Sequence, residues 1–410
     1  MKKALAIVLA AGFAVGSYAT DARVVVMGSH SAFYRDEVSI FKNPADISLY
    51  PNMLYGSYGK LPSDTTSDVG TYKNVYPHDP FFGAFMSHRF SEEENGPMFS
   101  IGAFVNRRDY VLDNLFDAPI IKPNPDRAVV LAPPVAKVDL IFGYDLGNGL
   151  ALGLGAYGAF QEVKDNDELI ARTSVYKGTL GINWNLEQGL DLEASVNGGV
   201  ITGKSAAFLE GIPLQSEGLA VAADQDFFWR GDVRFFSAVP AINGSFVPQV
   251  SLEFANYEAK SRLDLEGGVG ININIDRGFF WAGVQGLYTE DNKIGRNSYS
   301  KDESSIGARF SFGIERNIVW DWFLIRVGGQ KEVRNVNEDG NNSRWIENSP
   351  DFGVADGTDG DLVSLGFGLN IDNRLRIDFV ASEDVPYTFT NLVSGNKSYL
   401  FNRVSATYRF

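Results

Sequence analysis

Several segments of this chain alternate strictly between apolar residues and small or polar residues, and this pattern restricts the possible folds more than any other feature. Residues 269–275 read VGININI, residues 306–314 read IGARFSFGI and residues 363–371 read VSLGFGLNI. A repeat of two residues is the period of a β-strand. Strands buried on both faces are apolar throughout, so one face of these strands meets water or a polar interior.

The connections between the alternating segments are of two kinds. Tight-turn sequences rich in Asn, Asp and Gly, which tolerate positive φ angles, begin at Asp145, Asn185, Asn274 and Asn370. Longer connections lie at about 62–80, 107–135, 204–226, 291–302, 335–360 and 383–397. Short turns at one end and long loops at the other are typical of an outer-membrane barrel.

The alternation predicts sixteen strands, an even number that brings both ends of the barrel to the short-turn side. The predicted strands are 53–61, 81–90, 98–107, 136–145, 150–163, 174–186, 190–203, 227–238, 246–257, 262–275, 279–290, 303–316, 320–333, 361–371, 375–383 and 399–410. We therefore expect an all-β fold, a transmembrane antiparallel up-and-down β-barrel of 14–16 strands over residues 53–410. The alternative is a soluble exported sandwich or propeller, whose apolar faces would pair inward.

Both ends of the sequence favour export to a membrane. Residues 1–19 combine Lys2 and Lys3, an apolar stretch and small residues before the expected cleavage point, which predicts a signal peptide. The chain ends with Phe410 on the apolar face of its last strand, which resembles the signal read by the barrel-assembly machinery of bacteria. No later stretch approaches the ~20 apolar residues of a membrane helix. We expect a protein of the bacterial outer membrane, in contact with its lipid.

Composition limits the partners of the chain. It contains no cysteine, so its stability does not come from disulfides, although most small exported domains use them. Its formal net charge is −15, which disfavours binding to nucleic acid and to anionic lipid surfaces. We therefore expect no nucleic-acid partner.

The region before the first strand resembles a known family. The matching residues are Ala22-Arg23, Met27-Gly28, Ala32-Phe33, Asp36-Glu37 and Asn43-Pro44-Ala45. In this order they resemble the N-terminus of the long-chain fatty-acid channel (FadL-type) family and its PorV-like relatives. The resemblance implies that residues 20–52 form a hatch, a plug that closes the barrel lumen from the periplasmic side.

Two features of this chain depart from the family pattern. Asp46 follows Ala45 where a glycine or a small apolar residue is usual, and Ser29 replaces the second glycine of a pair. The sixteen predicted strands also exceed the fourteen of that family. The departures concern the hatch itself and the size of the barrel around it.

The chemistry of the Asn-Pro-Ala motif is compatible with a plug. Pro44 fixes its own φ and disfavours helix at Asn43, so the chain is expected to turn there. The Asn43 side chain can bond to nearby backbone, and the small Ala45 allows close approach to a wall. The alternative is an ordinary Asn-Pro turn in a linker.

Charged residues fall on the face of the strands opposite to the apolar one. A charge in contact with lipid near the membrane midplane costs roughly 2–4 kcal/mol, so a barrel must turn these residues inward. The resulting lumen is either wet or filled by a plug that pairs with the charges. The predicted lumen residues are Arg230, Asp232, Arg234, Arg309, Arg376 and Asp378, together with Asp139, Lys177 and Arg403.

Two of the long loops, 112–135 and 204–224, are unusually apolar. Exposed apolar surface is unfavourable in water, so such loops indicate a groove that captures a hydrophobic molecule. The alternative is packing of one loop on the other across the barrel mouth. The expected capture residues are Leu115, Phe116, Ile120, Ile121, Phe208, Leu209, Ile212 and Leu214.

No catalytic motif accompanies these features. The three histidines, at 30, 78 and 88, do not adjoin a plausible nucleophile, so we expect no enzyme, and no cofactor is implied. Asp356, Asp359 and Asp361 supply the several carboxylates that calcium prefers, but their spacing is not that of an EF-hand and solvated acidic loops are more common than calcium sites.

The sequence therefore predicts a hatch-gated outer-membrane channel for small hydrophobic molecules such as long-chain fatty acids. A diffusion porin for hydrophilic solutes and a non-transporting, PorV-like secretion partner are the alternatives. The sequence leaves open the substrate and the oligomeric state.

Overall fold

The computed structural model describes residues 21–28, 31–50, 52–59, 80–92, 96–109, 128–129, 134–165, 168–186, 189–205, 207–209, 212–213, 223–257, 260–293, 303–318, 320–338, 342–347, 351–352, 362–372, 374–381 and 401–410. The predicted signal peptide, 1–19, lies outside them, and so do the acidic positions 356–361. None of the helices in the described ranges is long and apolar enough to cross a membrane.

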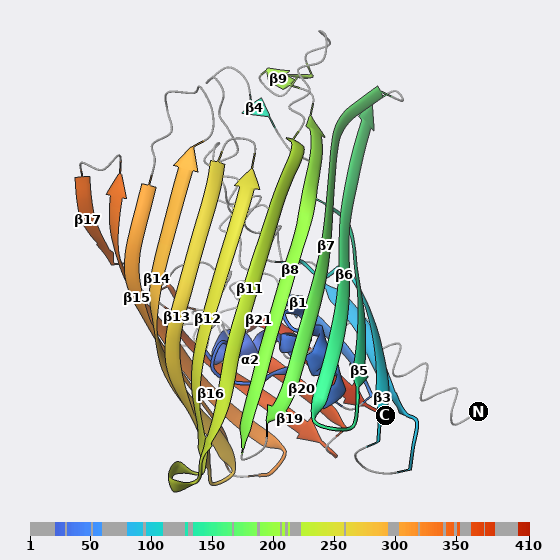
Figure 1. Ribbon diagram of the computed structural model, residues 1–410, viewed down its shortest axis with the longest axis vertical. Helices are drawn as coiled ribbons and strands as arrows, with labels where there is room; N and C mark the ends of the chain where they lie inside the picture. Colours follow the sequence, from blue (N-terminus) through green and yellow to red (C-terminus); the bar gives the residue numbers. More distant parts are fainter. Residues whose placement is uncertain are drawn as a thin grey trace, which may run out of the picture.

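Sixteen of the described strands form a closed antiparallel ring, as the alternation predicts (Figure 1). Each strand pairs with the next one along the chain, and β21 pairs with β1 to close the ring. The ring strands are β1 (Met53–Gly59), β2 (Phe81–Arg89), β3 (Met98–Val105), β5 (Ala136–Asp145), β6 (Leu150–Asp165), β7 (Glu168–Leu186), β8 (Leu190–Ser205), β11 (Ala223–Val239), β12 (Gly244–Tyr257), β13 (Lys260–Ile275), β14 (Gly278–Lys293), β15 (Glu303–Asn317), β16 (Phe323–Glu338), β19 (Leu362–Ile371), β20 (Leu375–Ala381) and β21 (Phe401–Arg409).

Short strands lie outside the ring order. β17 (Asn342–Glu347) pairs with the end of β16, and β18 (Asp351–Phe352) pairs with β19. β4 (Ala128–Val129), β9 (Ala207–Leu209) and β10 (Ile212–Pro213) form a small separate sheet at the long-loop end (Figure 1). These pieces lie in segments that the sequence predicts as loops, because two to six residues are too few to show alternation.

Several ring strands differ in extent from the prediction. β7 begins at Glu168 rather than at 174, and β16 covers Phe323–Glu338 rather than 320–333. The first residues of β7 still pair with β6 and β8 although the apolar alternation has ended there. Hydrogen bonding continues beyond the apolar part of the strand, and alternation detects only the apolar part.

The tight turns form where the sequence predicts them. Gly147, Gly149 and Gly189 have positive φ angles of 79°, 84° and 77°, and Arg277 and Asp372 also lie in the left-handed region. These residues allow two neighbouring strands to reverse within a few residues.

The alternation separates the two faces of the ring. Along β5, Val138, Leu140 and Tyr144 are exposed on the outside, whereas Lys137 and Asp139 are buried. The buried face of a closed ring is its interior, so the barrel is polar inside and apolar outside. This arrangement is the reverse of a soluble sandwich and excludes that alternative.

The N-terminal segment, defined here as residues 21–50, is described at 21–28 and 31–50, and these residues lie inside the ring (Figure 1). It contains α2 (Asp21–Val26) and two 3₁₀ helices, η1 (Glu37–Phe41) and η2 (Pro44–Leu49); a third 3₁₀ helix, η4 (Pro240–Ile242), forms a turn of the ring. α2 contacts β16 and β19–β21, and η2 contacts β3 and β5–β7. The segment therefore bridges two separate sectors of the inner wall.

Because the chain has no native cysteine, closure of the ring can be tested by cross-linking. Leu54 and Tyr408 lie opposite each other on the outer face of β1 and β21. We expect Leu54→Cys with Tyr408→Cys to form a disulfide, detected as a band that resists heat unfolding on a gel until it is reduced. Leu54→Cys with Val404→Cys, offset by about 14 Å along the strand, should not; a cross-link there would contradict the register.

Candidate functional site

The Asn-Pro-Ala motif starts η2 and attaches it to the wall. The Asn43 side chain caps the helix, since its Oδ1 accepts a hydrogen bond of 3.2 Å from the Ala45 N–H. Its Nδ2 donates to the backbone carbonyl of Ile182 on β7 at 3.0 Å. Pro44 occupies the first helical position, where no N–H is needed. One asparagine thus stabilises both the turn and its contact with the barrel.

A row of glycines on the inner wall receives this motif. Gly143, Gly153 and Gly181 lie directly opposite one another on β5, β6 and β7. A Cβ atom at Gly153 would lie 2.1 Å from the Ala45 nitrogen, and one at Gly181 would lie 2.0 Å from Asn43 Oδ1. We call this row the glycine trough. A side chain at Gly153 or Gly181 would therefore displace the segment.

A second group of glycines receives the first half of the segment. A Cβ at Gly328 would lie 2.1 Å from the Val26 carbonyl oxygen, and one at Gly366 would lie 2.5 Å from Val26 Cγ2. The Phe33 ring lies against Gly270 and Gly283 in the same way. The backbone N–H of Ala22 donates to Ser405 Oγ at 2.9 Å. Glycines therefore set the fit of both halves.

Buried ion pairs connect the segment to β15 and β20. Arg23 pairs with Glu315 at 2.9 Å and also with Asp36 of the segment. Glu315 in turn contacts Arg326 and, at 3.1 Å, Arg376. Removing one partner of such a network leaves an uncompensated buried charge, which costs about 3–5 kcal/mol.

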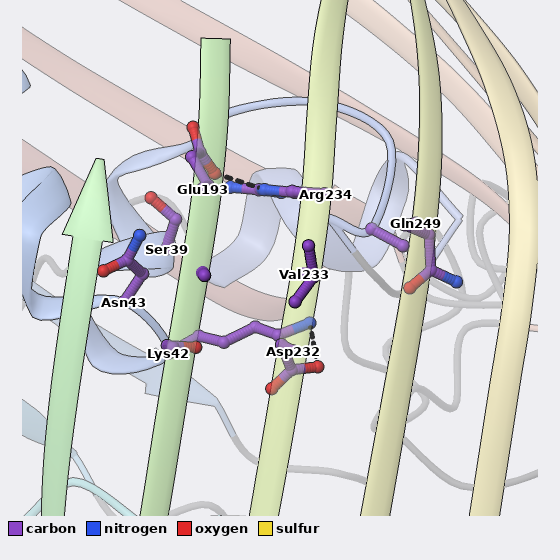
Figure 2. Close-up of a pocket in the computed structure, with 11 residues that line it drawn as sticks. Ser39, Lys42, Asn43, Glu193, Asp232, Val233, Arg234 and Gln249 are labelled. Carbon is purple, nitrogen blue, oxygen red and sulfur yellow. Dashed lines mark hydrogen bonds and ion pairs between the residues drawn. The ribbon is translucent and has the colours of Figure 1, made fainter. Parts of the chain in front are cut away.

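A second charged group lies against β8 and β11. Lys42 pairs with Asp232 at 2.8 Å, and Arg35 pairs with Asp191 at 3.0 Å and with Glu193. Arg234 also pairs with Glu193 (Figure 2). In this way the segment's cations meet carboxylates of the wall.

Asp46 is a buried carboxylate of the segment that is only partly hydrogen-bonded. Its Oδ1 accepts a hydrogen bond of 3.2 Å from Asn183 Nδ2, but its Oδ2 accepts none among the described residues. The nearest cation, Arg234 Nη2, lies 3.7 Å from Oδ2. Burial, and then the neighbouring Glu193, raise the pKa of Asp46 to about 7, against the opposing effect of Arg234.

A small cavity separates the segment from β8, β11 and β12 (Figure 2). Ser39, Lys42 and Asn43 line it on one side, and Ser195, Asp232 and Gln249 line the other. The space open to the centre of a water molecule is about 20 Å³, which is room for one or two waters. The cavity is therefore too small for an organic solute.

Beside η1 and η2, the inner wall is aromatic rather than charged. The Phe41 ring lies 4.8 Å from that of Phe104 and 6.1 Å from that of Tyr55, with Phe81 close by. We call the inward apolar residues of β1–β3 the aromatic sector; its members are Met53, Tyr55, Phe81, Phe85 and Phe104. One side of the lumen is thus apolar at the level of the segment.

Arg107 covers this sector from the long-loop side. Its guanidinium lies 4.1 Å from the centre of the Phe41 ring and pairs with Asp139 and Asp109, each at 2.7 Å. Asp109 also pairs with Lys177 at 2.6 Å. The predicted lumen residues Asp139 and Lys177 therefore belong to one buried group with two cations and two carboxylates.

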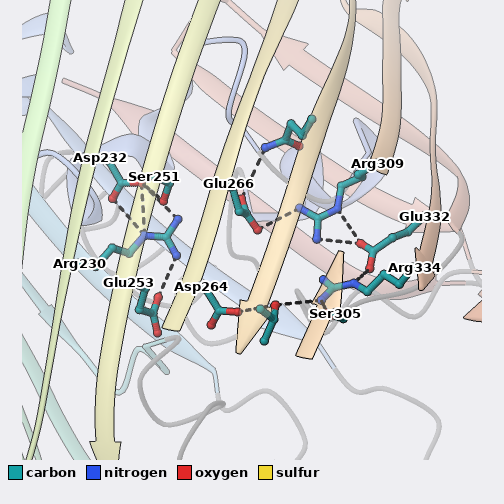
Figure 3. A network of polar contacts seen from close by, with 12 residues as sticks. Arg230, Asp232, Ser251, Glu253, Asp264, Glu266, Ser305, Arg309, Glu332 and Arg334 are labelled. Carbon is teal, nitrogen blue, oxygen red and sulfur yellow. Dashed lines mark hydrogen bonds and ion pairs between the residues drawn. The ribbon is translucent and has the colours of Figure 1, made fainter. Parts of the chain in front are cut away.

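The other predicted lumen residues also lie on the inner face. Arg230 pairs with Asp232 and Glu253, and Arg309 pairs with Glu332 and Glu266 (Figure 3). Arg376 and Asp378 pair with each other next to Glu315, Arg234 pairs as described above, and Arg403 is buried. Leaving Arg403 aside, these residues belong to four groups of ion pairs.

The predicted capture loops are described only in part. Leu115, Phe116, Ile120, Ile121 and Leu214 lie outside the described residues. Phe208, Leu209 and Ile212 belong to the backbone of β9 and β10, and β9 pairs with β4 of the other loop. This backbone pairing corresponds to the alternative of loop packing on loop. In the described part of the chain, no group of carboxylates and histidines is arranged to hold a metal ion.

Sequence reasoning missed the carboxylates Asp36, Asp46 and Glu315 as ion-pair partners, and it missed the aromatic sector. Alternation assigns each residue to a face but does not show which residues on distant strands meet. The glycines of the trough could have been identified from the sequence. Each lies at an inward position within a strand, where glycine weakens the strand and often marks the close approach of another backbone.

Comparison with known proteins gives little guidance. No family model matches the chain, and no curated protein matches it. Among solved structures, LpxR from Salmonella typhimurium aligns with a TM-score of 0.27 and 10% identity over 58% of this chain and 91% of LpxR. A TM-score this low carries no argument about fold or function. The resemblance of residues 22–45 to the fatty-acid channel family stays a prediction.

The glycine trough can be tested with a single methyl group. We expect Gly181→Ala to weaken docking of the segment, because overpacking costs roughly 1–3 kcal/mol. The matched control is Gly178→Ala on the same strand, where an added Cβ has no neighbour within 4 Å. Trypsin cleavage after Lys42 follows the undocked population and should rise roughly 5- to 100-fold in Gly181→Ala only. Equal rates in the two variants would contradict the role of the trough.

The raised pKa of Asp46 predicts how stability depends on pH. A carboxyl group whose pKa is higher in the folded protein than its unfolded value of 3.8 favours folding at low pH, and this contribution is lost as pH rises toward 7. We expect Asp46→Asn to remove this dependence. The melting temperature of Asp46→Asn minus that of the wild type should therefore be larger at pH 8 than at pH 5; a difference independent of pH would contradict the assignment.

Proposed function

We propose that the protein lies in the outer membrane, and the outside of the ring supports this location. Leu154, Leu180 and Val196 are neighbours on adjacent strands and are about half exposed. On β7 this apolar surface lies between the exposed Tyr176 and Trp184, eight residues apart, which is about 27 Å along the strand and about 20 Å along the membrane normal for a strand tilted by about 40°. Aromatic residues at both edges of an apolar band are typical of outer-membrane barrels.

We propose that the protein is an outer-membrane channel whose lumen is closed by the N-terminal segment, which acts as a hatch. The observation that carries this proposal is the docking of one segment against both sides of the lumen. Arg23 pairs with Glu315 on one side, and Asn43 bonds to Ile182 on the other. A solute that crosses the barrel has to displace this segment.

Small hydrophobic molecules, such as long-chain fatty acids, are the substrates we propose. The aromatic sector and Phe41 supply an apolar surface inside the lumen at the level of the hatch. An apolar solute that leaves water for such a surface gains free energy without any specific polar contact. The resemblance of the Asn-Pro-Ala region to the fatty-acid channel family supports the same class of substrate.

Our second proposal is a diffusion porin for hydrophilic solutes. The charged inner wall across the lumen from the aromatic sector favours it. The inner face of β11–β16 carries alternating arginines and carboxylates, including Arg230, Glu253, Arg309 and Glu332 (Figure 3). Such a wall holds water and offers no benefit to an apolar solute. A PorV-like barrel that binds a protein partner and passes no solute remains the third alternative.

Deletion of the hatch tests the closure. We expect removal of residues 22–50 to raise the ion conductance of the barrel in planar bilayers by a large factor, because the polar lumen would fill with water. Normal folding of the deletion variant is checked by the heat-dependent shift of its band on a gel. A correctly inserted variant with unchanged conductance would show that the segment does not close the lumen.

The substrate proposals are separated by uptake into proteoliposomes. We expect the intact protein to admit a labelled long-chain fatty acid and to exclude a small labelled sugar. Entry of the sugar would instead support the diffusion porin. Entry of neither, with the barrel folded, would direct attention to a protein partner.

A further inference from the structure

The two halves of the N-terminal segment are held in different ways. We call residues 21–34 the anchor half and residues 37–50 the gate half. Apolar burial does not distinguish them, because Met27 and Phe33 in one half and Ile40 and Ile47 in the other are all fully buried. The polar contacts differ.

Apart from the buried Tyr34 hydroxyl, which has no hydrogen bond to the described residues, the anchor half has well-satisfied polar contacts. Arg23 joins the network of Glu315, Arg326 and Arg376 on three strands. The backbone carbonyls of Ser31 and Tyr34 accept hydrogen bonds of 2.7 and 3.1 Å from Arg234. Moving this half would expose several charges that now neutralise one another.

Packing around Trp281 further fixes the anchor half. The Trp281 ring is fully buried, 6.0 Å from the ring of Phe33 and 5.3 Å from that of Tyr34. Phe33 also fits against Gly270 and Gly283, where no side chain intervenes. Close packing of rings into a glycine surface is specific to one position, so this half cannot slide without leaving voids.

The gate half has weaker polar contacts. It consists of two 3₁₀ helices, whose hydrogen bonds have poorer geometry than those of an α-helix. The last hydrogen bond of η2, from Tyr50 N to Ile47 O, is 3.5 Å long. Asp46 keeps one carboxylate oxygen without a hydrogen bond among the described residues. The Lys42 side chain, which pairs with Asp232, is 35% exposed.

The cavity lies beside the gate half. Its wall includes Gln249, whose Nε2 is buried and donates no hydrogen bond to the described residues. The gate half also packs against the aromatic sector, where Phe41 contacts Phe104 and Tyr55. Apolar contacts of this kind are not directional, so they allow a shift toward β1–β3.

We infer that the hatch opens in its gate half alone: residues 37–50 leave the glycine trough and shift toward the aromatic sector, while residues 21–34 stay docked. The solute path then runs along the inner faces of β5–β8. Its floor consists of Gly143, Gly153, Gly181 and Ser195, which are opposite one another in the sheet. This inference rests on the proposed function, because it specifies where the same hatch opens.

Asp36 marks the boundary between the halves. Its carboxylate pairs with Arg23 of the anchor half and accepts a hydrogen bond of 3.4 Å from Val38 N at the start of η1. The chain can therefore pivot just after Asp36 without breaking the anchor network. Arg35, with its side chain 30% exposed, borders the same point.

Thiol labelling of single-cysteine variants tests the inference without any transport assay. Val26 and Ile47 are 1% and 0% exposed, and the chain has no native cysteine. We expect Ile47→Cys to react with a membrane-impermeant maleimide at least about tenfold faster than Val26→Cys. A tenfold ratio needs a difference of only ~1.4 kcal/mol between the free energies of opening at the two positions. Equal rates, or faster labelling of Val26→Cys, would overturn the inference.

Two matched cross-links test whether solute entry requires the movement of the gate half. A Cβ at Gly143 would lie 2.4 Å from Ile47 Cγ2, and a Cβ at Gly366 would lie 2.5 Å from Val26 Cγ2, so both pairs are within reach of a disulfide. We expect Ile47→Cys with Gly143→Cys to abolish solute entry until the disulfide is reduced. Val26→Cys with Gly366→Cys should leave entry unchanged. Block by the second pair would overturn the inference.

The two tests separate the inference from the proposed function. Faster labelling at position 47, combined with unchanged conductance after deletion of 22–50, would refute the channel and leave the selective motion intact. Equal labelling at positions 26 and 47, combined with raised conductance after the deletion, would support the channel and refute the selective motion.

Discussion

A β-barrel turns one face of every strand inward, and in this chain that face carries arginines and carboxylates whose charges need partners. An unpaired ion in a poorly hydrated interior costs several kcal/mol. Above the N-terminal segment the wall pairs its own charges, as Arg309 does with Glu332 and Glu266. Around the segment the wall pairs are shared with the segment: Glu315 and Asp232 contact wall arginines and also Arg23 and Lys42.

Steric fit follows from the same arrangement. Ion pairs of about 3 Å between the segment and the wall require the two backbones to lie close together, and side chains on the wall would prevent this. The inward glycines of β5–β7 and of β13–β19 remove that obstacle. The cost is conformational, because glycine weakens a strand. Closure of the ring offsets this cost, since each of these strands is paired on both sides.

The sequence alone was sufficient for the ring but not for the site. Alternation identified all sixteen strands because membrane and lumen impose opposite polarities on the two faces of each strand. It placed Arg309 and Asp378 on the inner face for the same reason. It could not show that Arg376 meets Glu315, since the two belong to strands whose order in space depends on closure of the whole ring. The ends of β7 and β16 also escaped it, because pairing there continues without an apolar face.

The division of the lumen into an aromatic and a charged sector bears on how a hatch can move. Asn43 and Asp46 contact the polar wall through directional hydrogen bonds, whereas Phe41 contacts the aromatic sector through ring packing. Directional bonds are lost within a fraction of an ångström, and apolar contacts are retained over a larger displacement. A shift toward the aromatic sector therefore breaks the hydrogen bonds of Asn43 and Asp46 to β7 but keeps Phe41 out of water. A shift toward β11–β16 would place Phe41 and Ile40 among charges, so the polarity of the wall itself selects the direction of opening.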